Sequence, residues 1–332
     1  MSDNCISEDF VRCLPDATLN ILLKDHTRSR EGEHHNIFWM TSDYEVMGHG
    51  YGYHDEISPM QAKEEMNGIY LIGPRLSKAR DTQRDRSRDR AEVFTPAWIC
   101  NAQNNLIDSA WFGRDDVFNH ENPDHTWTVN PEPVTFPDGK TWTDYVRDTR
   151  LEITCGEAPY AVSRYDVTTG QPIDIDRRIG LIDRKLRIVG EHAKSSAQWL
   201  DYAQEAYKHT YGYEWQGDSL FIAREQLLLS FVEYYCHRFG RLPMLKSINY
   251  IAYIISWNFW QMDGLRCVVP DSCGCKPTGM VNFFGEAETA PCRGCATDNL
   301  FEHNGTYCLI RDWGASKGRE KKRFVDLLKR RP

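Results

Sequence analysis

The sequence predicts an α/β fold, with a sheet that carries helices on both sides. A strand-like stretch that begins at Leu151 ends in a tight turn at Gly156. Apolar residues three and four apart predict helices over residues 179–189 and 196–209. A second short strand, apolar and aromatic, ends at Glu214 and leads into another predicted helix. Strands and helices that alternate in this way are typical of an α/β sheet, here with helical insertions.

The chain has 332 residues, which is enough to bury a sizeable core. We divide it into an N-terminal extension (1–90), a core (91–265) and a carboxyl-terminal lobe (266–332). With 41% hydrophobic and 27% charged residues, its composition is that of ordinary globular proteins. The formal net charge of −8 argues against a uniformly basic nucleic-acid coat, but a local basic patch would still allow DNA binding.

Cysteine usage and hydropathy indicate the compartment. The apolar stretch at residues 250–257 is far too short to span a membrane, and the start at Met1 lacks the pattern of a secretory signal. Eleven cysteines are an odd number and are unevenly spread, which favours a reducing environment with a metal site over disulfides. We therefore expect a cytoplasmic protein without membrane contact.

The N-terminal 90 residues are polar and rich in turns, with short strands predicted over residues 37–40 and 69–72. Charges of alternating sign fill residues 75–90, which indicates a solvated helix with many ion pairs. Contact of the arginines in this segment with phosphate is the alternative.

A helix is predicted from Pro96 to Asp108. Proline suits the first position of a helix, and Thr95 suits the cap that precedes it. The free N–H groups of an exposed helix start favour a carboxylate or another anion. Further along, Gly156 lets the backbone approach a ligand beyond the end of a strand, where nucleotide-binding α/β folds hold their ligands.

Four segments in this order resemble the N-terminal part of S-adenosylmethionine-dependent DNA adenine-N6 methyltransferases, the modification subunits of restriction-modification systems. They are Thr95-Pro96, the loop from Glu152 to Tyr160, Glu214 and Asp263. The resemblance covers about residues 90–265. It implies a Rossmann-like methyltransferase sheet and DNA as a partner.

The same resemblance assigns a cofactor site. It implies that S-adenosyl-L-methionine contacts Thr95, Pro96, Glu152, Cys155, Gly156, Glu214 and Asp263. Within this set, Thr95-Pro96 would pack against the methionine half, Glu214 would hold the ribose and Asp263 would accept the adenine amine. Asp183, which is closer to Gly156 in the sequence than Glu214 is, is the alternative residue that would hold the ribose. We prefer Glu214 because it ends a strand and precedes the helix predicted over residues 219–235. For Asp263, a plain Asp-Gly turn after the apolar stretch 248–260 is the alternative.

The catalytic residues are not indicated by a complete motif. The Asn/Asp-Pro-Pro-Tyr/Phe/Trp tetrapeptide of the family is absent from the chain, and Ala158 stands where the family usually has a second glycine. The nearest local mimic is Asp312-Trp313, an acceptor followed by an aromatic residue, and we take these two as catalytic candidates. A second subunit that supplies recognition or catalysis is the alternative.

Four cysteines in two close pairs predict a metal site. A tetrahedral Zn²⁺ ion suits Cys273, Cys275, Cys292 and Cys295, with Cys308 as a substitute ligand. Because the protein fills all four positions, the zinc is expected to be structural. Beyond it, residues 311–332 are strongly basic, which indicates contact with a polyanion or an amphipathic helix over residues 321–331.

These features predict a DNA methyltransferase of the adenine-N6 type, or the modification subunit of a restriction-modification system. The alternative is a catalytically inactive methyltransferase-like protein that binds DNA or a partner, for example as an anti-restriction factor. Methylation of RNA or protein is a weaker option.

Overall fold

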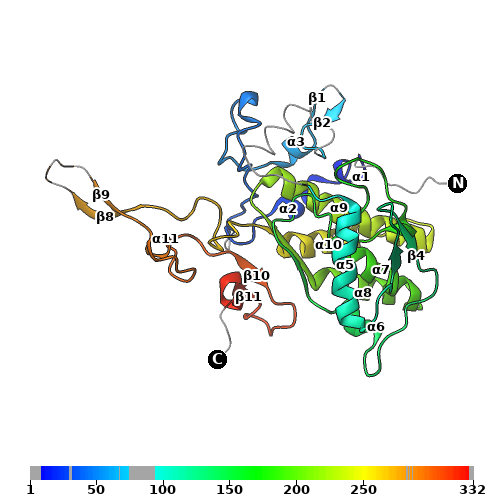
Figure 1. Ribbon diagram of the computed structural model, residues 1–332. Coiled ribbons are helices and arrows are strands. Elements are labelled where there is room, and N and C mark those ends of the chain that lie inside the picture. The colour runs from blue at the N-terminus through cyan, green and yellow to red at the C-terminus, as the bar shows by residue number, and fades with distance from the viewer. Residues whose placement is uncertain are drawn as a thin grey trace.

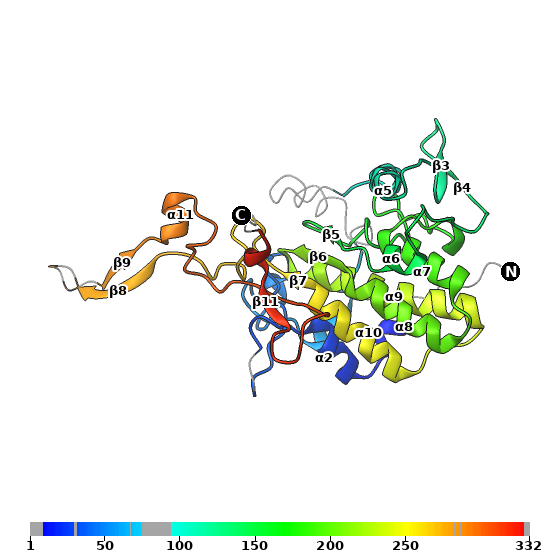
Figure 2. The same cartoon turned by 90° about the horizontal axis from the view of Figure 1, so that it is seen from below.

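The computed structural model describes residues 9–29, 32–66, 68–74, 94–281, 283, 285 and 287–328. A parallel sheet of three strands lies at its centre: β5 (Arg150–Glu152), β6 (Thr210–Glu214) and β7 (Phe259–Gln261), in the order β5-β6-β7. Figure 2 shows helices α8 (Ser196–Lys208), α9 (Gly217–Phe239) and α10 (Leu245–Asn258) beside this sheet. The fold is therefore mixed α/β, but three parallel strands do not by themselves make a Rossmann-type sheet.

The helices predicted from periodicity are present. They are α7 (Leu181–His192), α8 (Ser196–Lys208) and α9 (Gly217–Phe239), and their ends differ by only a few residues from the expected ones. Helices α7 and α8 form the insertion between β5 and β6.

The apolar stretch that periodicity left undecided forms a helix and then a strand. Helix α10 (Leu245–Asn258) passes directly into β7. The buried amide of Asn258 donates hydrogen bonds to the carbonyls of Tyr207, Lys208 and Thr210, at 2.8 to 3.1 Å. These bonds hold the end of the helix beside the start of β6, so the chain can continue as a strand.

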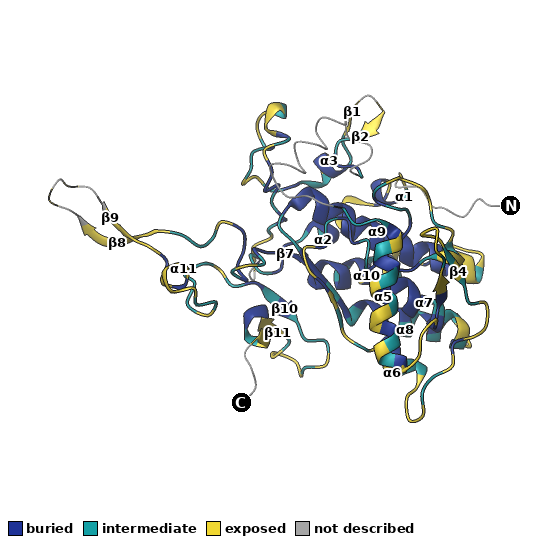
Figure 3. Cartoon of the chain, in the orientation of Figure 1, coloured by how far each residue is buried: buried dark blue, intermediate teal, exposed yellow. Residues whose placement is uncertain are grey.

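Helix α9 is the central element of the core, and its side chains are buried from Gly217 to Tyr235. A side chain at Gly217 would place its Cβ 1.7 Å from the carbonyl oxygen of Phe38, so this close approach needs glycine. Two buried glutamates of α9 are paired with arginines, Glu225 with Arg12 and Glu233 with Arg164, each at 2.7 Å. Figure 3 shows this helix and α10 in the buried colour.

The N-terminal segment is part of the core and not an appended extension. Val11, Leu19 and Trp39 are fully buried in the same hydrophobic cluster as α9 and α10. Its elements are α1 (Asp9–Arg12), α2 (Asp16–Leu23), η1 (Glu45–Met47), α3 (Pro59–Ala62), β1 (Glu65–Met66) and β2 (Ile69–Tyr70). The strand expected over residues 37–40 makes only an isolated bridge from Phe38 to Glu56. The charged segment predicted as a helix, residues 75–90, lies outside the described residues.

The two faces of the sheet are covered differently. Phe259 and Trp260, adjacent in β7, belong to two separate hydrophobic clusters because successive side chains of a strand point to opposite faces. The helices cover the Phe259 face. On the Trp260 face, Ile310 and Phe324 of the carboxyl-terminal segment pack instead of helices. The expectation of helices on both sides is thus wrong for this part of the sheet.

The carboxyl-terminal segment forms a hairpin on the body of the molecule. Strands β10 (Leu309–Arg311) and β11 (Lys321–Arg323) pair antiparallel and are followed by the 3-10 helix η4 (Phe324–Leu328). In the described part of the amphipathic helix expected over residues 321–331, residues 321–328, a strand and a 3-10 helix are found instead, and Phe324 and Val325 are buried against the sheet.

The remaining elements complete the body and the lobe. In the body they are α5 (Ala97–Phe112), β3 (Asn119–Glu121), β4 (Trp127–Val129), α6 (Trp142–Val146) and η3 (Ile175–Arg177). In the lobe they are β8 (Lys276–Val281), β9 (Ala287–Ala290) and α11 (Arg293–Thr297), which project from the body in Figure 1. None of the helices in the described ranges is both long and apolar enough to cross a membrane.

Candidate functional site

A cavity of about 950 Å³ opens at the carboxyl ends of β5 and β6. Five of the seven residues expected to contact the cofactor line it: Thr95, Glu152, Cys155, Gly156 and Glu214. These residues come from segments more than a hundred positions apart in the chain. The fold therefore gathers most of the predicted site into one cavity.

The glycine turn and the acidic strand end are in direct contact. The backbone N–H of Gly156 donates to Oε2 of Glu214 at 2.8 Å, and the N–H of Trp215 donates to Oε1 at 2.9 Å. The turn itself is bent sharply, since Thr154, Gly156 and Ala158 all have left-handed φ angles of 46°, 53° and 62°. Only glycine adopts this region without cost, so the two other residues store backbone strain of a kind found at functional sites.

Glu152 is a buried carboxyl group at the base of the cavity. It accepts hydrogen bonds from the N–H groups of Tyr160, at 3.2 Å, and Ala161, at 2.9 Å. Burial raises the pKa of Glu152 to about 8, and the nearby Glu214 adds to this rise, whereas the two backbone bonds oppose it. Near neutral pH this group is therefore mostly protonated and holds the loop without carrying a full charge.

The start of helix α5 differs from the prediction. The helix begins at Ala97 after Pro96 and extends to Phe112, and Thr95 makes no capping hydrogen bond. The N–H of Ala97 is instead bound by Oδ2 of Asp166 at 2.9 Å. The cap comes from a residue distant in sequence, which leaves Thr95 on the cavity wall while Pro96 is not part of the lining.

Asp183 and Asp263 do not line the cavity. The fully buried Asp183 caps the start of α7 and binds the N–H groups of Ser163, at 2.8 Å, and Gly180, at 3.1 Å. Asp263 binds the N–H groups of Leu265 and Arg266 in its own turn and pairs with the Arg266 side chain at 2.8 Å. The structure thus places Glu214 at the cavity in preference to Asp183, and gives Asp263 the role of an Asp-Gly turn.

The two catalytic candidates lie at the other end of the sheet. Nε1 of Trp313 donates to Asn258 at 2.9 Å, immediately before β7 begins, and Asp312 pairs with Lys322. Because the strands are parallel, this position is at their amino-terminal ends, whereas the cavity is at the carboxyl ends. Asp312 and Trp313 are therefore not part of the cavity, and their likeness to a catalytic motif was only local in sequence.

The aromatic residues that line the cavity were not among the predicted cofactor contacts. Tyr53, Phe94, Tyr160 and Trp215 line it, and Nε1 of Trp215 lies 3.3 Å from the Tyr53 hydroxyl. Trp215 follows Glu214 directly, so its position after a strand end was a signal. Tyr53 lies in a turn of the N-terminal segment, and nothing in its local sequence indicated this neighbourhood.

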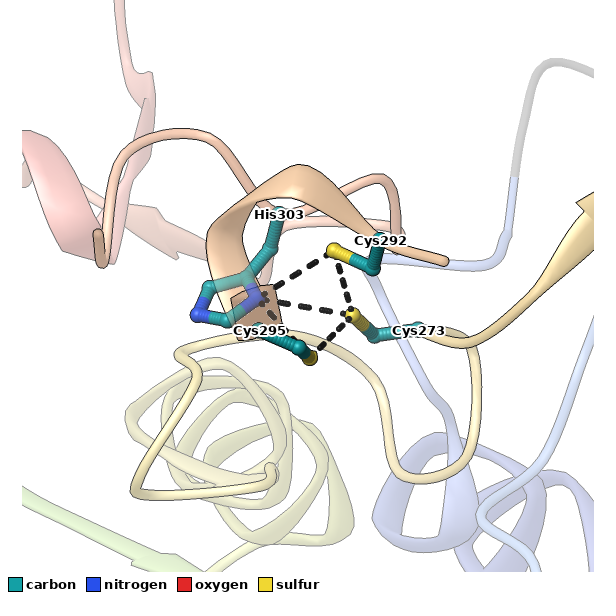
Figure 4. A group of neighbouring side chains, drawn as sticks. All are labelled: Cys273, Cys292, Cys295 and His303. Carbon is teal, nitrogen blue, oxygen red and sulfur yellow. Dashed lines mark hydrogen bonds between the residues drawn. The ribbon is translucent and has the colours of Figure 1, made fainter. Parts of the chain in front are cut away.

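A second group of side chains in the lobe can hold a metal ion. The Sγ atoms of Cys273, Cys292 and Cys295 and Nδ1 of His303 all lie within 4.8 Å of one another (Figure 4). Nδ1 is 3.4 to 3.6 Å from the three sulfur atoms, and Cys273 Sγ is 3.2 Å from Cys292 and 3.6 Å from Cys295. Tetrahedral zinc with Zn–S of about 2.3 Å and Zn–N of about 2.0 Å requires S···N and S···S separations of about 3.5 and 3.8 Å. The donor set and its spacing therefore suit zinc.

The cluster contains His303 in place of the expected Cys275. Cys275 is exposed and lies outside the cluster. The side chain of Asn304 binds the backbone of Gly274 twice, at 3.2 and 2.8 Å, which holds the neighbouring His303 against Cys273. His303 follows Cys295 by eight residues, so its place near the second cysteine pair was a weak signal in the sequence beside the Cys-x-x-Cys spacing of Cys292 and Cys295.

The surroundings of Cys292 favour its thiolate. Burial alone would raise the pKa of this thiol, but hydrogen bonds from the N–H groups of Cys295 and Asn304 outweigh burial and lower the pKa to about 6. The Asn304 N–H lies 3.2 Å from the sulfur. Since the thiolate is the form that binds metals, this cysteine is prepared for coordination at neutral pH.

No protein-family model matches the chain, and comparisons with curated proteins and with solved structures also found no match.

Proposed function

We propose that the protein binds S-adenosyl-L-methionine in the large cavity and acts as a DNA adenine-N6 methyltransferase or as the modification subunit of a restriction-modification system. The observation that carries this proposal is the contact of Gly156 with Glu214 at the carboxyl ends of two adjacent parallel strands. Ligands of open α/β sheets bind at such strand ends, where a glycine turn and a following carboxylate hold the nucleoside.

The size and walls of the cavity support a nucleoside ligand. A volume of about 950 Å³ lies within the range of about 300–1,000 Å³ typical of small-molecule sites. The aromatic side chains of Tyr53 and Trp215 offer stacking surfaces for a purine. When a ribose binds, the Glu214 carboxylate would give up some of its hydrogen bonds from backbone N–H groups and accept hydrogen bonds from the ribose hydroxyls.

The outer rim of the cavity supports a base as the second ligand. Leu151 and Ile153 line the cavity and yet are 43% and 63% exposed, an unusual state for aliphatic residues beside a sheet. An adenine taken out of its DNA helix needs an apolar surface of this kind next to the methyl donor. The three-stranded sheet would then correspond to the first half of a doubly wound methyltransferase sheet.

For the lobe we propose a structural zinc ion held by Cys273, Cys292, Cys295 and His303. All four positions are filled by the protein, which is the arrangement of structural and not of catalytic zinc. The exposed hairpin β8–β9 beside it and the basic strand β11 would present surfaces to DNA or to a second subunit.

The alternative proposal is a methyltransferase-like protein without activity, which binds DNA or a partner and acts, for example, against a restriction system. It is favoured by the position of Asp312 and Trp313 at the far end of the sheet, because this removes the only local candidates for the catalytic motif.

Calorimetric titration of S-adenosyl-L-methionine into the full-length protein tests the cofactor site. We expect saturable binding in the wild type and a loss of about ten-fold or more in Glu214→Gln, since a charge-assisted hydrogen bond contributes about 1.5–3 kcal/mol. Glu132→Gln, at an exposed position outside the cavity, is the matched control and should bind as the wild type does. Absence of binding in the wild type, or equal binding in both variants, refutes the cofactor site.

Methyl transfer to DNA then separates the two functions. Incubation with tritiated S-adenosyl-L-methionine and unmethylated DNA should label adenine if the protein is an active enzyme. Cofactor binding without labelling supports the inactive form, and labelling that appears only with a co-expressed partner indicates a second subunit.

A further inference from the structure

A second cavity, of about 560 Å³, lies on the other side of α7, away from the proposed cofactor site. Its walls include five arginines but only two carboxylates, Asp176 and Glu191. Both carboxylates are engaged, Glu191 with Arg187 at 2.9 Å and Asp176 with His237 at 3.6 Å. The cavity is therefore markedly cationic, in a protein whose net charge is negative.

The arginines of this cavity fall into two groups. Arg178 and Arg184 are buried and paired with Glu233 and Asp108, at 2.6 and 2.5 Å. Arg177 and Arg238, in contrast, are exposed at the mouth of the cavity, and no carboxylate of the described residues forms an ion pair with either. Two guanidinium groups without a counter-charge at one opening suit a ligand with a divalent anionic group.

The floor of the cavity holds an unsatisfied donor. Arg184 is 1% exposed, lines the cavity, and its Nε has no hydrogen-bond partner among the described residues. Buried donors of this kind are uncommon because each costs free energy when it is left unpaired. A ligand oxygen that reaches this depth would supply the missing acceptor.

Helix α7, which forms one wall of the cavity, has a glycine among its lining residues. Arg184, Arg187 and Gly190 are spaced by three residues along α7, which places them on one face toward the cavity. A Cβ on Gly190 would meet no atom within 4 Å, so glycine is not required there by crowding. Glycine inside a helix is unfavourable relative to alanine, and a side chain much larger than alanine at this position would occupy part of the cavity that Gly190 lines.

Much of the remaining lining is apolar. The half-buried Ile175 and Val129 and the exposed Pro131 offer apolar surface to a ligand, whereas Trp199 lies in the wall with only 1% of its surface exposed. An inorganic ion would leave these surfaces unused, whereas a ligand with a ring system would cover them.

We propose that this second cavity binds an organic phosphate of about the size of a mononucleotide, with the phosphate between Arg177 and Arg238 and the organic part against Ile175 and Pro131. This site is independent of the proposed methyltransferase function, because it uses neither the strand ends nor Glu214.

Calorimetric titration of the full-length protein with AMP, inorganic phosphate and adenosine tests the proposal. We expect AMP to bind more tightly than phosphate. In Arg238→Gln, the loss of one charge-assisted hydrogen bond should weaken AMP binding about ten-fold or more. Arg241→Gln, an exposed arginine three residues away and outside the cavity, is the matched control and should change affinity less than two-fold. AMP binding should also persist in Glu214→Gln, which distinguishes this site from the first cavity.

A second variant tests the shape of the site. Gly190→Leu should fill part of the cavity and abolish AMP binding. Gly190→Ala leaves most of the cavity free, so it should still bind AMP. The thermal unfolding midpoint of Gly190→Ala shows whether helix α7 tolerates a side chain at this position. Absence of AMP binding in the wild type overturns the proposal, as does equal binding in Arg238→Gln and Arg241→Gln. Phosphate binding as tight as that of AMP overturns the assignment of an organic ligand.

Discussion

In the α/β body, helix α9 is buried along residues 217–235, whereas in the described part of residues 271–306 only Cys292 and Gly294 are buried. The body has apolar surface to bury and adds paired charges such as Arg12 with Glu225. The lobe has almost none, so we expect its fold to depend on the proposed metal ion at Cys273, Cys292, Cys295 and His303 and on backbone hydrogen bonds. Two regions of one chain thus rely on different sources of stability, and they should respond to different perturbations.

The largest expected effect is the loss of metal from the lobe. Structural zinc sites contribute roughly 10–16 kcal/mol of apparent binding free energy in small domains, and the lobe has no core that would replace this contribution. His303→Ala should therefore lose zinc and expose residues 271–306 to protease, while helix α9 stays protected from hydrogen exchange. Elemental analysis and limited proteolysis measure both effects.

The matched control for the metal site is Cys275→Ser. This cysteine is exposed and outside the cluster, so the variant should keep one zinc ion per chain and the protease resistance of the wild type. Loss of zinc in Cys275→Ser, with retention in His303→Ala, would show that the ligands are the four cysteines after all.

The second effect belongs to the body. Arg12→Met removes the ion pair between Arg12 and the buried carboxylate of Glu225, which should lower the free energy of unfolding by about 3–5 kcal/mol. Lys63→Met breaks an exposed pair with Asp16 and should cost only about 0–1 kcal/mol. Urea unfolding followed by tryptophan fluorescence compares the two variants, and zinc content should be unchanged in both. Equal losses would mean that burial does not set the strength of this pair.

The third effect is a pH dependence within the body. Because the pKa of Glu152 is raised from about 4.3 in the unfolded chain to about 8, the folded protein binds the extra proton between these values. The contribution to stability is complete below about pH 4 and is lost as the pH rises toward 8, with a slope on the order of 1 kcal/mol per pH unit. Glu152→Gln should flatten this slope, as measured by urea unfolding at a series of pH values. An unchanged slope would show that Glu152 is ionised in the folded protein.

Local sequence patterns predicted much of the fold but few of the long-range contacts. The helices α7, α8 and α9 follow from apolar residues three and four apart, because this spacing depends only on the geometry of one helix. The stretch over residues 248–260 was undecided for the same reason, since a buried helix and a buried strand are equally apolar. The choice depended on Asn258, whose amide binds three carbonyls near the start of β6.

The same division applies to the two sites. The sequence alone determined that a glycine turn and a strand-end carboxylate exist, and that closely spaced cysteines favour a metal. Only the tertiary structure decided that Glu214 and not Asp183 faces the cavity, and that His303 and not Cys275 completes the cluster. The reason is physical: a ligand set requires atoms within a few ångströms of one another, and this proximity arises from packing between segments that no local pattern relates.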